Sequence, residues 1–223
     1  MEPLLRESDE HRLFRRTVAE FVANEITPFV NEWDEAEEFP RELYRKAGKV
    51  GIFAIGFAEE HGGLGTHDAL LFAILAEELA QCGAGGVPAS LFSNYIGAPP
   101  IQAAGTSGTQ AEILPGMLAG EIVCALAVTE PGGGSDVANL TTTAVADGDE
   151  YVVNGQKTFI TSGMRADYVT TAVRTGGPGA AGVSLLAIPT DLPGFEATPL
   201  EKMGWWSSDT ATLYFDDCRV PAK

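Results

Sequence analysis

The stretch GEIVCALAVTEPGGGSD, residues 120–136, marks a change in the pattern of the sequence. Before it, apolar residues recur at helical spacing, whereas after it they fall into short runs with a period of two. Its own first half, residues 122–129, is a strand candidate that runs into three consecutive glycines. We therefore predict an α-helical domain over residues 1–120 and a β-domain over residues 121–223.

Helices are expected over residues 8–28, 40–51, 68–79, 89–104 and 109–119. Asp68 can cap the third of them, whose residues leave little polar face, so we expect this helix to be buried among others. The last helix should bend or break at Pro115, because proline removes a backbone donor.

Strands are expected over residues 122–129, 141–146, 151–154, 157–161, 168–173, 183–189, 195–199 and 212–215. Asn154-Gly155 indicates a tight hairpin turn, because a type I′ turn needs positive φ at both central positions. Many short strands separated by turn residues are typical of an antiparallel sandwich or barrel. The predicted fold class is therefore α+β, with an all-α domain followed by a β-domain.

The charge of the chain excludes some partners. Its 223 residues carry 14 Lys and Arg against 31 Asp and Glu, a formal net charge of −17. Nucleic acids and anionic membranes are not expected to bind, because phosphate groups require clustered basic side chains. The apolar stretch 69–79 is too short to span a bilayer, and no secretory signal is seen at the N-terminus. A cytoplasmic location is expected.

The cysteines and histidines suggest no further chemistry. Cys82, Cys124 and Cys218 are isolated, so neither a disulfide framework nor a zinc site is predicted. The three histidines are scattered without ligand spacing, and no metal site is expected.

The glycine turn in TEPGGGSD, residues 129–136, is the strongest chemical signal. Glycines let the backbone approach a ligand closely, and successive N–H groups can bind a diphosphate. The turn has no P-loop lysine and leads into another strand pattern, so neither a Walker loop nor a Rossmann turn fits. Taken alone, the glycines are a weak signal and favour a plain loop turn.

Three segments together resemble the acyl-CoA dehydrogenase family: AVTEPGGGSD (127–136), NGQKTFIT (154–161) and KMGW (202–205). EEHGGLG (59–65) and residues 114–121 are similar to the helical N-terminal domain of that family. FDDCRVP (215–221) is similar to the run that leads out of its middle β-domain. The resemblance covers the whole chain, in order.

The resemblance implies an FAD-dependent enzyme of fatty acid β-oxidation. Such an enzyme oxidises acyl-CoA thioesters to 2,3-enoyl-CoA, passes electrons to an electron-transfer flavoprotein and forms a homo-oligomer, either a dimer or a tetramer. By position, the residues implied to line the flavin are Leu126, Val128, Thr129, Phe159, Ile160 and Thr161. Gly134 and Ser135 would hold the diphosphate, with Ser135 also near the acyl-CoA. Donors such as Thr129 and Thr161 would stabilise the charge of the reduced flavin, although strand threonines also simply suit a β-surface.

The chain departs from the family at some positions. Phe159 stands where a tryptophan is frequent, and Leu126 where an aromatic residue is frequent. Trp205 and Trp206 are candidates for the acyl-CoA entrance, with plain packing as the alternative.

No catalytic residue is assigned. Glu130 and Asp136 are expected to cap turns or pair locally, since a cleft base needs burial or charge coupling. The resemblance implies a base from a C-terminal four-helix domain, expected beyond Lys223. Two alternatives stay open: a non-catalytic acyl-CoA-binding subunit completed by a partner, and a flavin oxidase or monooxygenase on the same scaffold. The length and branching of the acyl group are left open.

Overall fold

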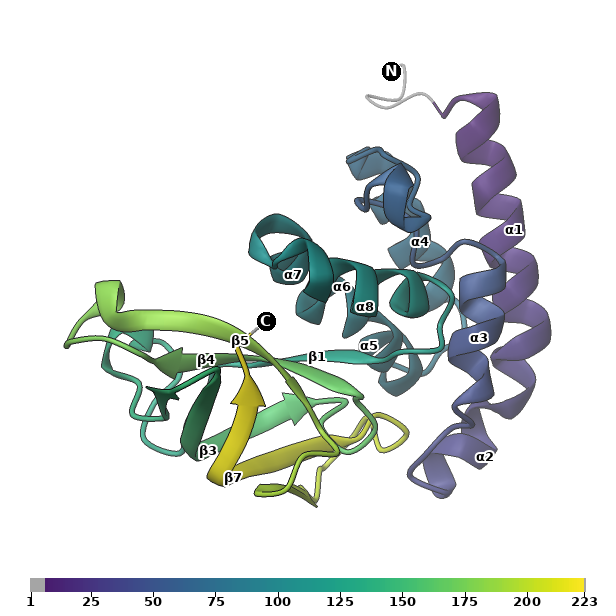
Figure 1. Cartoon of the computed structure of the whole chain (residues 1–223). Coiled ribbons are helices and arrows are strands. Elements are labelled where there is room, and N and C mark those ends of the chain that lie inside the picture. Colours follow the sequence, from purple (N-terminus) through teal and green to yellow (C-terminus); the bar gives the residue numbers. More distant parts are fainter. Residues whose placement is uncertain (1–6, 223) are drawn as a thin grey trace.

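The computed structural model describes residues 7–222, and it shows helices followed by a curled mixed sheet (Figure 1). The helices are α1 (Asp9–Glu25), α2 (Val30–Glu35), α3 (Glu42–Lys49), α4 (Ala69–Ala80), α5 (Gly86–Phe92), α6 (Asn94–Gly97), α7 (Pro99–Ala104) and α8 (Ser107–Leu118). The strands are β1 (Cys124–Ala127), β2 (Thr143–Asp147), β3 (Glu150–Thr161), β4 (Tyr168–Arg174), β5 (Val183–Pro189), β6 (Phe195–Pro199) and β7 (Thr210–Pro221). The predicted helical and β regions are confirmed.

A side-chain cap accounts for the start of α1, α4 and α8. Asp68 caps α4 as expected, since its Oδ1 accepts a hydrogen bond of 2.8 Å from the backbone N–H of Leu70. The segment expected to be one helix over residues 89–104 is divided into α5, α6 and α7. Helix α8 is not broken at Pro115, because four buried apolar residues around the proline hold it against the core: Ile113, Leu114, Met117 and Leu118.

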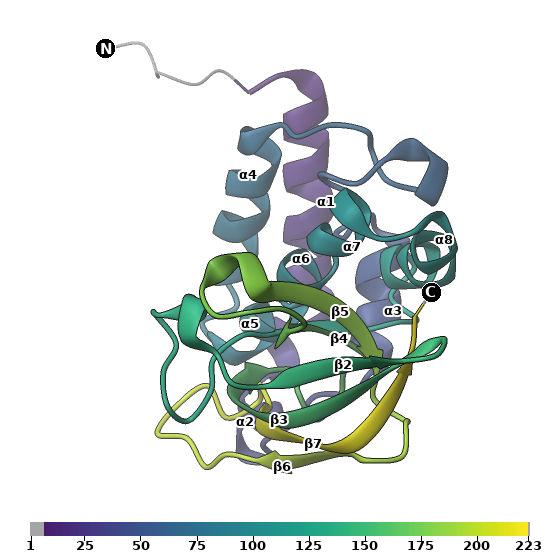
Figure 2. The ribbon, with the colours of Figure 1, turned by 60° about the vertical axis from the view of Figure 1, so that its left-hand side comes forward.

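The β-domain is one seven-stranded sheet. Six strands follow the order β1-β4-β2-β3-β7-β6, and the seventh, β5, lies outside this order and pairs with β4 (Figure 2). The expectation of a purely antiparallel arrangement is corrected here. Strand β1 runs parallel to β4, and β2 meets β4 in a parallel pairing of Thr143 with Arg174. The other pairings are antiparallel.

The predicted hairpin at Asn154-Gly155 is wrong, because β3 continues through both residues. The chain turns instead at Gly148, between β2 and β3. Gly155 has φ 144° and lies at a shift in the register between β3 and β7. A Cβ there would lie 2.7 Å from the Cα of Thr142, so the glycine serves a close backbone approach rather than a turn.

The helices pack on one side of the sheet, with α5 to α8 nearer to it than α1 (Figures 1 and 2). One contact between the two parts is made by Arg41, which precedes α3. Its guanidinium pairs with Asp167 and donates hydrogen bonds to the carbonyl oxygens of Arg165 (2.8 Å) and Glu121 (3.1 Å). Within residues 7–222, no helix is both long and apolar enough to cross a membrane.

Candidate functional site

Two segments far apart in the sequence meet beside the glycine turn. The backbone N–H of Thr158 donates a 2.9 Å hydrogen bond to the carbonyl oxygen of Thr129. The Nζ of Lys157 donates to the carbonyl oxygen of Val128 at 3.0 Å. The end of β3 is therefore fastened to the segment that follows β1, and Thr129 is brought close to the residues around Phe159.

A buried ion pair holds this junction. The side chain of Lys157 is fully buried, and its Nζ lies 2.9 Å from Oε1 of Glu130, which is 7% exposed. Glu130 also accepts hydrogen bonds from the backbone N–H groups of Thr141 (2.7 Å) and Thr142 (2.9 Å), and one of 2.7 Å from the Thr141 hydroxyl. These bonds satisfy both carboxylate oxygens, as a buried charge requires.

The pKa of Glu130 reflects the same contacts. Burial raises this pKa, but the hydrogen bonds from Lys157, Thr141 and Thr142 outweigh burial and lower the pKa to about 2. Glu130 is thus a charged structural group, as the sequence had indicated. Asp136 also pairs locally, accepting a 2.6 Å hydrogen bond from Nδ2 of Asn139.

The glycine turn is closed by two 3.0 Å hydrogen bonds between the backbones of Glu130 and Gly133. Beyond the Cα atoms of Gly132 and Gly133 there is open space, with no atom within 4 Å of a Cβ built there. A Cβ on Gly134 would lie 3.1 Å from both Oγ1 and Cγ2 of Thr129. The turn thus leaves room for a ligand beside its backbone, next to a threonine hydroxyl, and this donor set fits a diphosphate.

An irregularity in β3 decides which side chains face outward. The register between β3 and β7 shifts between Lys157 and Ile160, and Phe159 has φ 60° within this shift. The Phe159 ring is 69% exposed as a result, whereas Ile160 is 2% exposed and packs in the hydrophobic core. With its side chain buried, Ile160 would present its backbone to a ligand at this place, and its expected position beside a flavin stays a prediction.

The other expected residues are all at least partly exposed. Leu126, Val128, Thr129 and Thr161 are half-buried, and Gly134 and Ser135 are exposed. Thr161 ends β3, where it pairs with Thr210. No role was assigned to Lys157 from the sequence. The available signal was a lysine inside a strand with one buried face, because a lysine is rarely buried without a partner.

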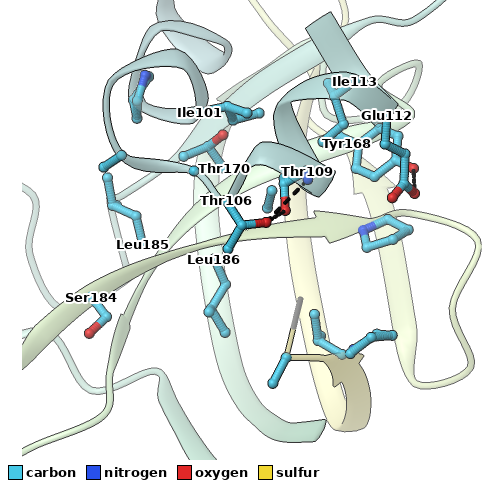
Figure 3. A pocket seen from close by; sticks show the side chains of 18 of the residues that line it. Ile101, Thr106, Thr109, Glu112, Ile113, Tyr168, Thr170, Ser184, Leu185 and Leu186 are labelled. Atoms are coloured by element: carbon cyan, nitrogen blue, oxygen red, sulfur yellow. Dashed lines mark hydrogen bonds between the residues drawn. The ribbon is translucent and has the colours of Figure 1, made fainter. Parts of the chain in front are cut away.

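A cavity lies elsewhere, between α7, α8 and β5 (Figure 3). It measures about 680 Å³, and its walls are mainly apolar, with Ile101, Ile113 and Leu186 facing it. At its edge the Tyr168 hydroxyl donates a 2.9 Å hydrogen bond to Glu112, and burial raises the pKa of Tyr168 to about 12. None of the eight site residues expected from the sequence lines this cavity. We assign the site by its chemistry rather than by volume.

Comparison with known proteins gives a consistent result. The models for the acyl-CoA dehydrogenase N-terminal and middle domains match residues 8–121 and 125–218. Long-chain specific acyl-CoA dehydrogenase from Rattus norvegicus is 40% identical over 97% of this chain and 51% of its own length.

Solved structures agree. The structure of a probable acyl-CoA dehydrogenase from Mycobacterium abscessus has a TM-score of 0.92 and 51% identity, and the match covers 96% of this chain and 57% of that one. A glutaryl-CoA dehydrogenase from Mycobacterium smegmatis in complex with FADH2 has a TM-score of 0.87 and 29% identity, with coverage of 97% and 55%. The chain spans about half the length of the relatives it matches.

Proposed function

The chain belongs to the acyl-CoA dehydrogenase family, and from that premise we propose that it forms the flavin-binding part of an enzyme that oxidises acyl-CoA thioesters to 2,3-enoyl-CoA. The observation that carries the proposal is the open glycine turn, fastened by Lys157 to the end of β3. FADH2 in the M. smegmatis relative supports FAD as the cofactor. The electron acceptor in this proposal is an electron-transfer flavoprotein.

Each residue of the site has a physical role in this proposal. The turn at Gly134 and Ser135 would hold the diphosphate of FAD, because its backbone is exposed and free of side-chain bulk. Thr129 and Thr161 would hydrogen-bond the edge of the flavin, and Phe159 would cover its ring. When bound, FAD supplies the chemistry of the reaction by accepting hydride from the substrate. The protein residues bind and orient it.

The removal of the substrate α-proton needs a carboxylate with a free lone pair. Glu130 is fully engaged with Lys157, Thr141 and Thr142, and Asp136 is exposed, without the burial that tunes a cleft base. We propose that neither residue acts as the base, which leaves 126–136 and 157–161 as a cofactor-holding surface.

The test is anaerobic reduction of the complete FAD-loaded enzyme, in which this chain is joined to the region expected to supply the base. Mixing with a saturated acyl-CoA should bleach the flavin absorbance stoichiometrically and form 2,3-enoyl-CoA, whereas free CoA should leave the flavin oxidised. In air, the reduced flavin of a dehydrogenase should reoxidise slowly, but rapidly when an electron-transfer flavoprotein is added. Rapid reoxidation by oxygen would indicate an oxidase, and a flavin that no acyl-CoA reduces would indicate a non-catalytic acyl-CoA-binding subunit.

A further inference from the structure

The side chain of Arg174, at the end of β4, joins two backbone segments that are far apart in the sequence. Its Nε donates a 3.0 Å hydrogen bond to the carbonyl oxygen of Leu140, and its Nη2 donates one of 2.7 Å to that of Ala138. Its Nη1 donates to the carbonyl oxygens of Gly177 (2.7 Å) and Gly179 (3.2 Å). The half-buried guanidinium therefore holds both segments with charge-assisted hydrogen bonds.

The first of these segments is the direct continuation of the glycine turn. Residues 131–135 are exposed, and the short 3₁₀ helix Val137–Asn139 follows them. The backbone strengthens the same anchor, because the N–H of Arg174 donates a 2.7 Å hydrogen bond to the carbonyl oxygen of Thr142. The buried ion pair fixes the chain where it enters the turn, and Arg174 fixes it where it leaves. The path of the exposed backbone between these two anchors depends on both.

The second segment encloses the guanidinium from another side. A Cβ on Gly182 would lie 1.8 Å from the carbonyl oxygen of Gly177 and 3.0 Å from Nη1 of Arg174, so only glycine fits there. The two segments thus meet around the forked end of an arginine. A lysine has a single donor atom at its tip and could not serve all four carbonyl oxygens.

The charge of Arg174 is not neutralised by an acidic side chain. Within residues 7–222, its four side-chain hydrogen bonds all go to backbone carbonyl oxygens, and none of its nitrogens pairs with a carboxylate. The charge of Lys157, by contrast, is neutralised by Glu130. In a chain with a net charge of −17, Arg174 therefore leaves a positive charge beside the segment that would receive an anion.

We propose that Arg174 is a positioning residue for the cofactor. Through the carbonyl groups that it holds, it sets the backbone of the turn at Gly134 and Ser135, and its charge favours a diphosphate there. The inference rests on the proposed function, because the occupant of the turn is FAD. Arg174 itself need not touch the cofactor, since it acts through the backbone that it fixes and through its charge.

The test is the dissociation constant for FAD of the complete enzyme in its apo form. It is measured at about 50 mM and about 500 mM NaCl, because salt screens charges but leaves hydrogen bonds in place. We expect Arg174→Met to raise the constant about tenfold at the lower salt concentration and by a smaller factor at the higher one. Arg219→Met is the matched control, because Arg219 also lies in the β-domain but is 54% exposed and pairs with Asp147 and Glu150. It should leave the constant unchanged.

Arg174→Lys separates the two contributions. It keeps the charge but loses the fork, so the constant should rise less than in Arg174→Met, and by the same factor at both salt concentrations. This variant also decides the question if Arg174→Met does not fold.

Three results would overturn the inference and leave the proposed function intact. They are wild-type affinity for FAD in either Arg174 variant, a loss in Arg174→Met that is the same at both salt concentrations, and an equal loss in Arg219→Met. If the wild-type enzyme does not bind FAD, the proposed function fails, and this inference fails with it.

Discussion

The cofactor-holding surface and the loop between β6 and β7, residues 201–209, both belong to the β-domain, yet they are built in opposite ways. In the first, a buried lysine and a buried carboxylate satisfy each other and the surrounding backbone. In the second, the Trp205 indole is exposed and only the backbone beneath it is held. The comparison indicates that the chain holds the backbone of both regions by hydrogen bonds but buries the charged side chains of the first and exposes the apolar side chains of the second.

The largest effect should come from breaking the buried pair. Lys157→Met removes the positive charge and leaves Glu130 buried without a counter-ion, so we expect a loss of about 3–5 kcal/mol in the free energy of unfolding. Urea unfolding measures it. Lys46→Met is the control, because the Lys46–Glu25 pair is on the surface, with Lys46 45% exposed, and should contribute about 1 kcal/mol or less. Equal losses in the two variants would contradict a structural role for Lys157.

The same pair predicts a pH dependence. Because the folded-state pKa of Glu130 is lowered to about 2, its carboxylate stabilises the fold above the unfolded pKa of about 4.3. That stabilisation, on the order of 3 kcal/mol, is lost as the pH falls from about 4.3 to about 2. Unfolding free energies measured across this range should therefore fall less steeply in Glu130→Gln than in wild type. Parallel pH profiles would show that Glu130 titrates normally.

Substitution of Thr129 or Thr161 should change the free energy of unfolding less than substitution of Lys157 does, and should mainly change the properties of the bound flavin. In the FAD-loaded protein, Thr129→Val or Thr161→Val removes one donor to the flavin, and each should cost about 1–3 kcal/mol of flavin stabilisation. A lower flavin potential or slower reduction by acyl-CoA would report this loss. Thr198→Val, on the exposed face of β6, is the control. If flavin potential and reduction rate are unchanged in both variants, the two threonines do not face the flavin.

Short-range signals predicted much of this molecule. Strands β5 and β6 were predicted to the residue, because turn residues bound both of them. The two motifs that the resemblance assigns to one site are in contact, since the backbone N–H of Thr158 donates to the carbonyl oxygen of Thr129. The hairpin predicted at Asn154-Gly155 was wrong because a glycine can serve either a turn with positive φ or a close approach of two backbones. Only the position of Thr142 beside Gly155 shows that the second role applies.

Long-range contacts account for what the sequence could not show. The pairing of Lys157 with Glu130 joins residues 27 positions apart. The outward turn of Phe159 depends on the register shift between β3 and β7, which no local pattern marks. The position of the Trp205 indole likewise depends on Gly85, in a different domain.

The affinity of a Gly134→Ala variant for FAD tests the central claim most directly. The added methyl group would press on the Thr129 side chain at 3.1 Å and displace the hydroxyl that the proposal places at the flavin. We expect the dissociation constant for FAD to rise at least about tenfold, or about 1.4 kcal/mol, with an unchanged unfolding midpoint. Gly204→Ala, where a Cβ meets open space, should change neither quantity. If Gly134→Ala binds FAD as tightly as wild type, the glycine turn is not where the cofactor is held.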